Sequence, residues 1–253
     1  MDAATVTNFM QLPVATAADA DPLVQSTYRK LVGMLIWLYK TRPDVMFTIN
    51  LLARYLHNST KAHFDVARNR PLRYLKGTKF YGLVFAPGVS SEWKLSGSSD
   101  ADLAGDKMSS RSTTGFYSKL GEFGTVSYNC SLERKICSST QQAETYALAS
   151  MVKDTIWLRQ LLHELGLTQK GPTTQRTDNQ GVYLQSSKQV NHTTAKHFRI
   201  SQALIRNAGD DGVIHVDKVG TKDNVSDIFT KASMPKDGFF KCRLSVMGPQ
   251  DRA

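Results

Sequence analysis

The chain has 253 residues, of which 41% are hydrophobic, and this composition is enough for a substantial core and excludes disorder throughout. No apolar run is long enough to cross a bilayer, and no basic region followed by an apolar run opens the chain, so we expect no membrane partner and no secretory signal. The formal net charge is +10; the first 24 residues hold three acids and no Lys or Arg, so the remainder carries +13. This charge favours a polyanionic partner such as nucleic acid, although a basic surface that serves only solubility explains it equally well.

The three cysteines are Cys130, Cys137 and Cys242. Their number is odd and their spacing contains no CxxC pair, so the sequence predicts neither a disulfide framework nor a zinc site. This cysteine usage fits a reducing compartment.

The first predicted elements are a loose leader and a helix. Residues 1–24 are rich in Ala, Thr and Asp without a sustained period, and we expect them to be loosely ordered. Ser26 or Thr27 can cap a helix, which Pro43 ends because a residue before proline avoids helical angles. The apolar positions of this helix recur at spacings of three and four: Leu31, Met34, Leu35 and Leu38.

Two more helices are expected before residue 80. Asp44 is placed to cap a helix whose apolar face holds Phe47, Leu51, Leu52 and Tyr55. A third helix is expected from Ser59 or Thr60 to Gly77, and Pro71 lies inside it and should kink it.

From residue 81 the pattern changes to strands and then to alternating helices and strands. Four β-rich runs cover 81–85, 94–99, 113–120 and 125–131. A long helix over 142–165 ends at Gly166. The remaining expected elements are a strand over 173–177, helices over 179–187 and 194–207, a strand over 213–219 and a last helix that begins within 225–231. This order predicts an α/β fold with a mixed sheet covered by helices.

Four acidic residues stand at strand ends and helix starts, where side chains can converge at one edge of such a sheet. Asp100 and Asp178 follow strands, whereas Glu144 and Asp227 lie in the first turns of helices. Two carboxylates about 4 Å apart repel by roughly 4 kcal/mol at an effective dielectric of 20, so a cluster requires cations. Oxygen ligands favour Mg²⁺ or Mn²⁺. Taken alone, each acid is better explained by a structural role: Glu144 and Asp227 can complement a helix dipole, and Asp100 and Asp178 can cap loops, and spacing does not prove that the four converge.

The motifs around these acids carry a resemblance. The blocks are LSGSSDADLAGD (95–106), RSTTGFYSKLG (111–121), CSSTQQAETYALAS (137–150), TDNQGVYL (177–184), AKHFRI (195–200) and VSDIFTKAS (225–233). In this order they resemble the C-terminal ribonuclease H region of copia-type retrotransposon Pol polyproteins. Upstream, YRKLVGMLIWLYKTRPDV (28–45) and LRYLKGT (72–78) resemble the connection that follows the reverse transcriptase.

The resemblance implies a ribonuclease H-like mixed sheet flanked by helices and preceded by a small helical connection. It implies that Asp100, Glu144 and Asp178 are core metal ligands and that Asp227 is the fourth, which makes all four catalytic, with Mg²⁺ or Mn²⁺ as cofactor. Asp102 is the nearest rival to Asp100, but we expect it to lie past the strand end.

The resemblance also suggests residues that contact nucleic acid. Asn179 and Gln180 could hydrogen-bond the RNA strand, but capping the following helix is about as good an explanation for both. His197 matches a recurrent histidine of the family, and a salt-linked surface role is equally good.

Some residues depart from the family pattern. Ser98 and Leu103 stand where aromatic residues are usual, and Gln142 stands where another acid is usual. ARNRPLRYL (67–75) carries an extra residue and a proline. The chain also contains no Tyr-x-Asp-Asp segment, so we expect no polymerase site and interpret the chain as a fragment or a shortened reading frame.

We therefore expect a leader (1–24), a helical connection remnant (25–80), a ribonuclease H domain (81–240) and a tail (241–253). The expected activity is two-metal-ion, endonucleolytic hydrolysis of RNA in RNA–DNA hybrids during reverse transcription. The rest of a reverse transcriptase is a further expected partner, and a cytoplasmic virus-like particle or the nucleus is the expected location. The alternatives are a decayed, inactive fragment that still binds hybrids, and a transposase or integrase, which also uses three carboxylates.

Overall fold

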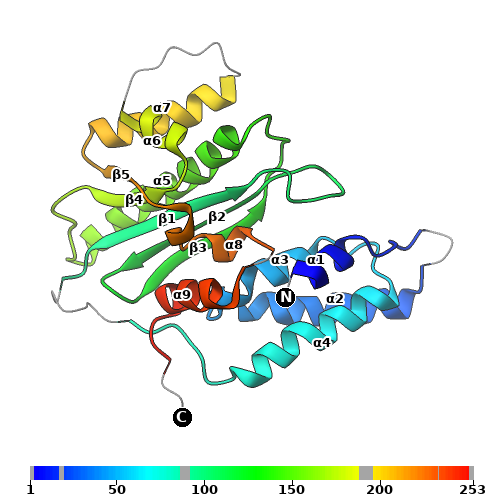
Figure 1. Ribbon diagram of the computed structural model, residues 1–253. Coiled ribbons are helices and arrows are strands. Elements are labelled where there is room, and N and C mark those ends of the chain that lie inside the picture. Colours follow the sequence, from blue (N-terminus) through cyan, green and yellow to red (C-terminus); the bar gives the residue numbers. More distant parts are fainter. Residues whose placement is uncertain (1–2, 17–19, 86–91, 188–195, 233, 251–253) are drawn as a thin grey trace.

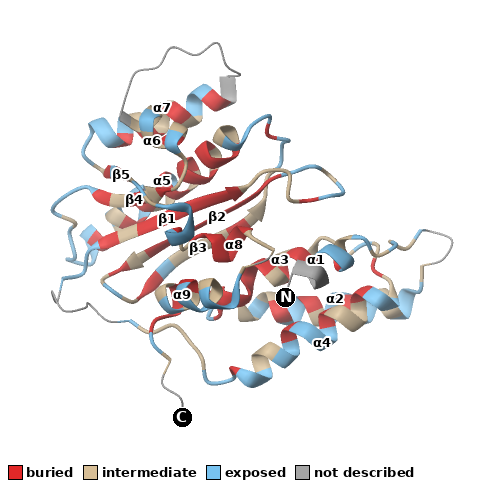
Figure 2. Cartoon of the chain, in the orientation of Figure 1, coloured by how far each residue is buried: buried red, intermediate tan, exposed pale blue. Residues whose placement is uncertain are grey.

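The fold consists of one five-stranded sheet between two groups of helices (Figure 1). A computed structural model describes residues 3–16, 20–85, 92–187, 196–232 and 234–250. One group of helices, α5, α6 and α7, lies on one face of the sheet, and the helices formed by the two ends of the chain lie on the other. Buried residues follow the central strands and the helix sides that face the sheet (Figure 2).

The sheet is mixed, with the strand order β3-β2-β1-β4-β5. Strands β1 (Leu95–Asp102), β2 (Thr113–Leu120) and β3 (Thr125–Leu132) form an antiparallel meander. Strands β4 (Thr173–Thr177) and β5 (Ile214–Lys218) continue the sheet, parallel to β1. This arrangement confirms the predicted ribonuclease H-like fold class and makes β1 the central strand.

Three helices cover one face of the sheet. They are α5 (Thr140–Glu164), α6 (Gln180–Ser187) and α7 (Lys196–Asp210). Ser139 begins α5 by accepting a hydrogen bond from the Gln142 amide, which places the long apolar side of the helix over β1 and β2. The helix thereby buries Leu148, Met151 and Val152.

The opposite face is covered by helices from both ends of the chain. The first group comprises α1 (Ala3–Met10), α2 (Pro22–Leu38), the 3₁₀ turn η1 (Pro43–Val45), α3 (Met46–Ala53) and α4 (Lys61–Gly77). The second comprises η2 (Thr221–Asp223), α8 (Asp227–Thr230) and α9 (Lys236–Met247). These elements and the sheet share one apolar core, because Phe9, Leu52, Tyr117 and Phe229 belong to the same buried cluster.

The expectation of a loose leader is wrong for residues 3–10, which form α1. Val6 and Phe9 are 2% and 1% exposed, and the Phe9 ring packs edge-on against Tyr55 at 5.0 Å. The order comes from tertiary packing, which the lack of a sustained apolar period did not reveal.

Caps explain where the next helices begin. Asp21 accepts hydrogen bonds from the amides of Leu23 and Val24, and Pro22 is compatible with the first turn, so α2 begins upstream of the predicted caps Ser26 and Thr27. Helix α4 begins after Thr60 as predicted, in a reciprocal cap with His63, and the helix continues through Pro71.

Asp44 does not cap a helix, contrary to the sequence prediction. Its carboxylate instead accepts two hydrogen bonds from Arg42, at 2.9 and 2.8 Å, and one from the Tyr74 hydroxyl at 2.6 Å. Arg42 also donates to the Thr78 carbonyl at 2.9 Å. This buried network joins η1 to α4.

Two further predictions at the ends of the sheet domain are corrected. Residues 81–85 form no strand; the amide of Val84 donates to the carbonyl of Met247 at 2.8 Å, which holds this segment beside α9. The expected tail beyond residue 240 is in large part the second half of α9, where Cys242, Val246 and Met247 are buried in the common core.

Two other expectations concern cysteines and membranes. Cys130, Cys137 and Cys242 are free and buried. Among the helices of the described ranges, none has the length and apolar character that a membrane crossing needs.

The buried pair of Arg42 and Asp44 gives a test of the connection between η1 and α4. The side chains of Arg42 and Asp44 are only 6% and 0% exposed, so Arg42→Met leaves a buried carboxylate without its cation. We expect urea denaturation to show a loss of about 3–5 kcal/mol in the free energy of unfolding. The control Lys61→Met, from an exposed pair with Asp65, should cost less than about 1 kcal/mol. Equal losses in both variants would contradict this assignment.

Candidate metal centre

Asp100 lies on the central strand and is 2% exposed. The strand continues to Asp102, so the prediction that Asp102 lies past the strand end is wrong. Two residues along a strand keep both side chains on one face, but Asp102 is only half-buried and does not belong to the carboxylate group described below.

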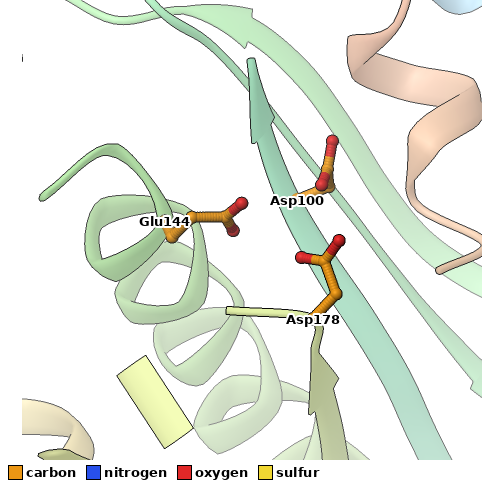
Figure 3. A group of neighbouring side chains, drawn as sticks. All are labelled: Asp100, Glu144 and Asp178. Atoms are coloured by element: carbon orange, nitrogen blue, oxygen red, sulfur yellow. The ribbon is translucent and has the colours of Figure 1, made fainter. Parts of the chain in front are cut away.

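Three of the four predicted acids converge (Figure 3). Asp100 from β1, Glu144 from α5 and Asp178 after β4 each offer an oxygen, and these oxygens all lie within 4.8 Å of one another. The parallel register of β1 and β4 explains why Asp100 and Asp178 lie side by side. Ser98 is opposite Arg176, so the positions two residues further along each strand, Asp100 and Asp178, are opposite each other. The cap at Ser139 sets where α5 begins and thereby places Glu144, 3% exposed, opposite them.

Burial and mutual repulsion disfavour the charged forms of this group. The pKa of Glu144 is raised to about 9, chiefly by burial and also by the charges of Asp100 and Asp178, although a hydrogen bond from the Ala101 backbone lowers it. The pKa of Asp100 is raised to about 7, chiefly by burial and also by the charge of Asp227, although a hydrogen bond from Thr230 lowers it. The site therefore needs positive charge to hold these carboxylates ionised.

The donor set fits a divalent cation. In the described part of the chain, Glu144 Oε2 and Asp227 Oδ1 are buried and lack a hydrogen-bond partner. A buried acceptor without a donor is costly, and a bound ion is one way to satisfy it. Carboxylate oxygens without Cys or His suit Mg²⁺ or Mn²⁺ rather than zinc.

The structure places Asp227 beside this group but not within it. It lies in the first turn of α8, and its Oδ2 accepts a hydrogen bond from Lys231 Nζ at 2.7 Å. Burial raises the pKa of Asp227, and the ion pair with Lys231 lowers it. Lys231 occupies only Oδ2, so Asp227 could still offer an ion its Oδ1, which lacks a hydrogen-bond partner within the described ranges.

The three residues predicted to contact nucleic acid are Asn179, Gln180 and His197, and the first two differ in their surroundings. The side chain of Asn179 accepts a hydrogen bond from the Val182 amide at 3.1 Å, which is the capping role. Gln180 is exposed, and its side-chain oxygen accepts a hydrogen bond from Lys218. The side chain of His197 lies outside the described residues.

Sequence reasoning missed three polar residues around the acids. Lys231 pairs with Asp227, and Asn224 and Thr230 both hydrogen-bond the carboxylate of Asp100. Lys231 stands four residues after Asp227, a spacing at which helical side chains meet, so that pair was readable in the sequence. The contacts to Asp100 cross more than 120 residues and leave no local signal.

Comparison with known proteins gives a consistent set of relatives. No family model matches the chain. The Retrovirus-related Pol polyprotein from transposon RE1 of Arabidopsis thaliana is 34% identical over 204 residues, 81% of this chain and 14% of that protein. The Retrovirus-related Pol polyprotein from transposon TNT 1-94 of Nicotiana tabacum is 32% identical over 232 residues, 91% of this chain and 17% of that protein. The chain thus spans less than a fifth of either relative.

Among solved structures, RNase H1 from the halophilic archaeon Halobacterium salinarum is 16% identical, with a TM-score of 0.39. The alignment covers 54% of this chain and 94% of that one.

The raised pKa values predict how pH affects the metal-free fold. Between its usual pKa and about 9, folded Glu144 holds a proton that the unfolded chain releases, so the free energy of unfolding falls as pH rises across this range. Asp100 lowers the free energy of unfolding in the same way as pH rises to about 7. Each of the two groups changes the free energy of unfolding by at most about 1.4 kcal/mol per pH unit.

Urea denaturation in EDTA from pH 5 to 9 measures this fall. Glu144→Gln should flatten it and stabilise the metal-free chain at pH 8. A variant with the same slope as the wild type would mean that Glu144 is not the titrating group.

Proposed function

We propose that this chain, which is similar to the retrovirus-related Pol polyproteins of transposons, is the divalent-metal-dependent ribonuclease H of such a polyprotein. Its proposed reaction is endonucleolytic hydrolysis of the RNA strand of RNA–DNA hybrids. The main observation behind this proposal is that Asp100, Glu144 and Asp178 bring carboxylate oxygens within 4.8 Å of one another, where strands β1 and β4 end.

The chemistry follows from what these residues can hold. The three side chains point toward one another from β1, α5 and the end of β4, so their oxygens could hold divalent cations between them. When bound, two Mg²⁺ or Mn²⁺ ions supply an activated water and stabilise the leaving oxygen of an in-line phosphodiester displacement. Asp100, Glu144 and Asp178 would hold these ions, and Asp227 could add its Oδ1, which has no hydrogen-bond partner among the described residues.

The charge of the chain supports a polyanionic substrate. Beyond residue 24 the net charge is +13, and phosphate contacts by Lys and Arg provide most of the affinity for a nucleic-acid backbone. We include the rest of a reverse transcriptase as a proposed partner. A cytoplasmic virus-like particle or the nucleus is the proposed location.

The first test is cleavage of a labelled RNA–DNA hybrid by the full chain with Mg²⁺ or Mn²⁺. We expect the RNA to be cut within the hybrid while duplex DNA of the same sequence stays intact. Asp100→Asn is the inactive control, because it removes the central ligand charge and should lower cleavage below detection at every metal concentration.

Two outcomes would contradict the proposal. Binding of hybrid without cleavage in either metal would favour the decayed fragment. Cutting or joining of duplex DNA would favour a transposase or integrase.

The second test concerns the graded role of Asp227. Its carboxylate is shared with Lys231 and lies outside the group of three, so Asp227→Asn should retain cleavage, with a rate about tenfold lower at limiting Mg²⁺. Raised Mn²⁺ should restore most of that rate in a metal titration of the cleavage assay. A titration curve identical to the wild type would remove Asp227 from the site and leave three ligands.

A further inference from the structure

Residues 224–230, which we call the strap, cross the buried half of β1 beside Asp100. Ser226 Oγ donates to the Ser98 carbonyl at 2.6 Å, and Asn224 Nδ2 donates to the Ser99 carbonyl at 3.0 Å. Asn224, Ser226 and Thr230 are 1%, 0% and 0% exposed, so these polar side chains are withdrawn from water. Burying a polar side chain costs free energy unless a hydrogen bond compensates for the lost water, and these hydrogen bonds supply that compensation.

Both oxygens of the Asp100 carboxylate accept a hydrogen bond from the strap. Asn224 Nδ2 donates to Oδ1 at 3.3 Å, and Thr230 Oγ1 donates to Oδ2. We propose that Thr230 and Asn224 are positioning residues that fix the orientation of the Asp100 carboxylate toward the cations of the centre. This inference rests on the proposed function and adds two residues to its machinery.

The hydrogen-bonding capacity of a carboxylate makes this role possible. An ionised carboxylate has about four lone-pair sites on its two oxygens. One donor on each oxygen therefore leaves a lone pair on each for a cation. The terminal torsion of aspartate is broad, and donors on both oxygens restrict it. The two hydrogen bonds from the strap thereby hold the Asp100 carboxylate in one rotation and leave a lone pair free on each oxygen.

The neighbouring strand is shaped to let Thr230 reach Asp100. Gly115 on β2 is the register partner of Asp100, and it has no side chain to hold the strap away. A Cβ built on Gly115 would lie 2.5 Å from Phe229 Cβ and 2.9 Å from Thr230 Cγ2. A side chain at position 115 would therefore push Thr230 off the carboxylate. This close approach is an observation independent of the hydrogen bonds.

The test compares Thr230→Val, which removes the hydroxyl, with Thr230→Ser, which keeps it. Mn²⁺ affinity of the full chain is measured by calorimetric titration without nucleic acid, and hybrid cleavage gives kcat and KM. We expect Thr230→Val to bind Mn²⁺ about tenfold more weakly and to lose kcat with little change in KM. Thr230→Ser should stay near the wild type in both measurements.

A matched control separates positioning from a general loss of stability. Thr155 is also a fully buried threonine with one hydrogen-bonded partner, Gln175, and it lies outside the centre. Thr155→Val should lower the melting temperature and leave the Mn²⁺ affinity unchanged. If Thr230→Val does not fold, Gly115→Ala displaces the same hydroxyl from the side of β2 and should weaken Mn²⁺ binding in the same titration.

The outcomes are distinguishable. Wild-type Mn²⁺ affinity in folded Thr230→Val, or an equal loss in Thr230→Ser, overturns the positioning role while leaving the nuclease proposal intact. A wild-type chain that neither binds Mn²⁺ nor cuts the hybrid overturns both. Weak binding in Thr230→Val together with recovery in Thr230→Ser supports the inference.

Discussion

The burial of neighbouring carboxylates is the physical constraint on which this site depends. Asp100 and Glu144 are almost fully buried, and with Asp178 they bring oxygens within 4.8 Å. Burial and repulsion raise the pKa of two of them, so the metal-free fold stores unfavourable electrostatic energy that other interactions must offset. A bound cation would relieve this cost, so the cluster is compatible with a divalent-metal site.

The common apolar core offsets the electrostatic cost of burying these acids. The sheet, the N-terminal helices and α8 bury one continuous apolar cluster, in which Phe229 stacks parallel to Tyr128 at a ring separation of 6.4 Å. Each fully buried aromatic or aliphatic side chain contributes about 1.5–3 kcal/mol, so a few such residues can balance the repulsion of the acids. The helices that precede the sheet thus stabilise the centre without contributing a ligand to it.

Helices and strands were predicted correctly from the sequence where local residue preferences determine them. They were predicted poorly where tertiary packing determines them. The bounds of β2 and β4 match the prediction because alternating or β-branched residues are enclosed by turn residues. Helix α1 was missed because two buried side chains, Val6 and Phe9, order it only in the presence of the core. Asp44 fits a capping rule in sequence, but Arg42 lies two residues away and a buried ion pair prevails. In the centre, motif order predicted the three acids that meet, whereas hydrogen bonds across the fold could not be read from spacing.

The strap connects the apolar core to the carboxylate of Asp100. Within seven residues it carries Asn224 and Thr230, which hold Asp100, and Phe229, which is fully buried between the sheet and the N-terminal helices. Phe229 and Thr230 are neighbours in the short helix α8, so the residue that packs in the core is adjacent to the one that hydrogen-bonds the carboxylate. Ile228 and Phe229 of α8 both belong to the apolar core that the N-terminal helices share, so this core lies directly beside the candidate metal centre. The geometry of the candidate metal centre therefore depends on the N-terminal helices as well as on the ribonuclease H-like sheet.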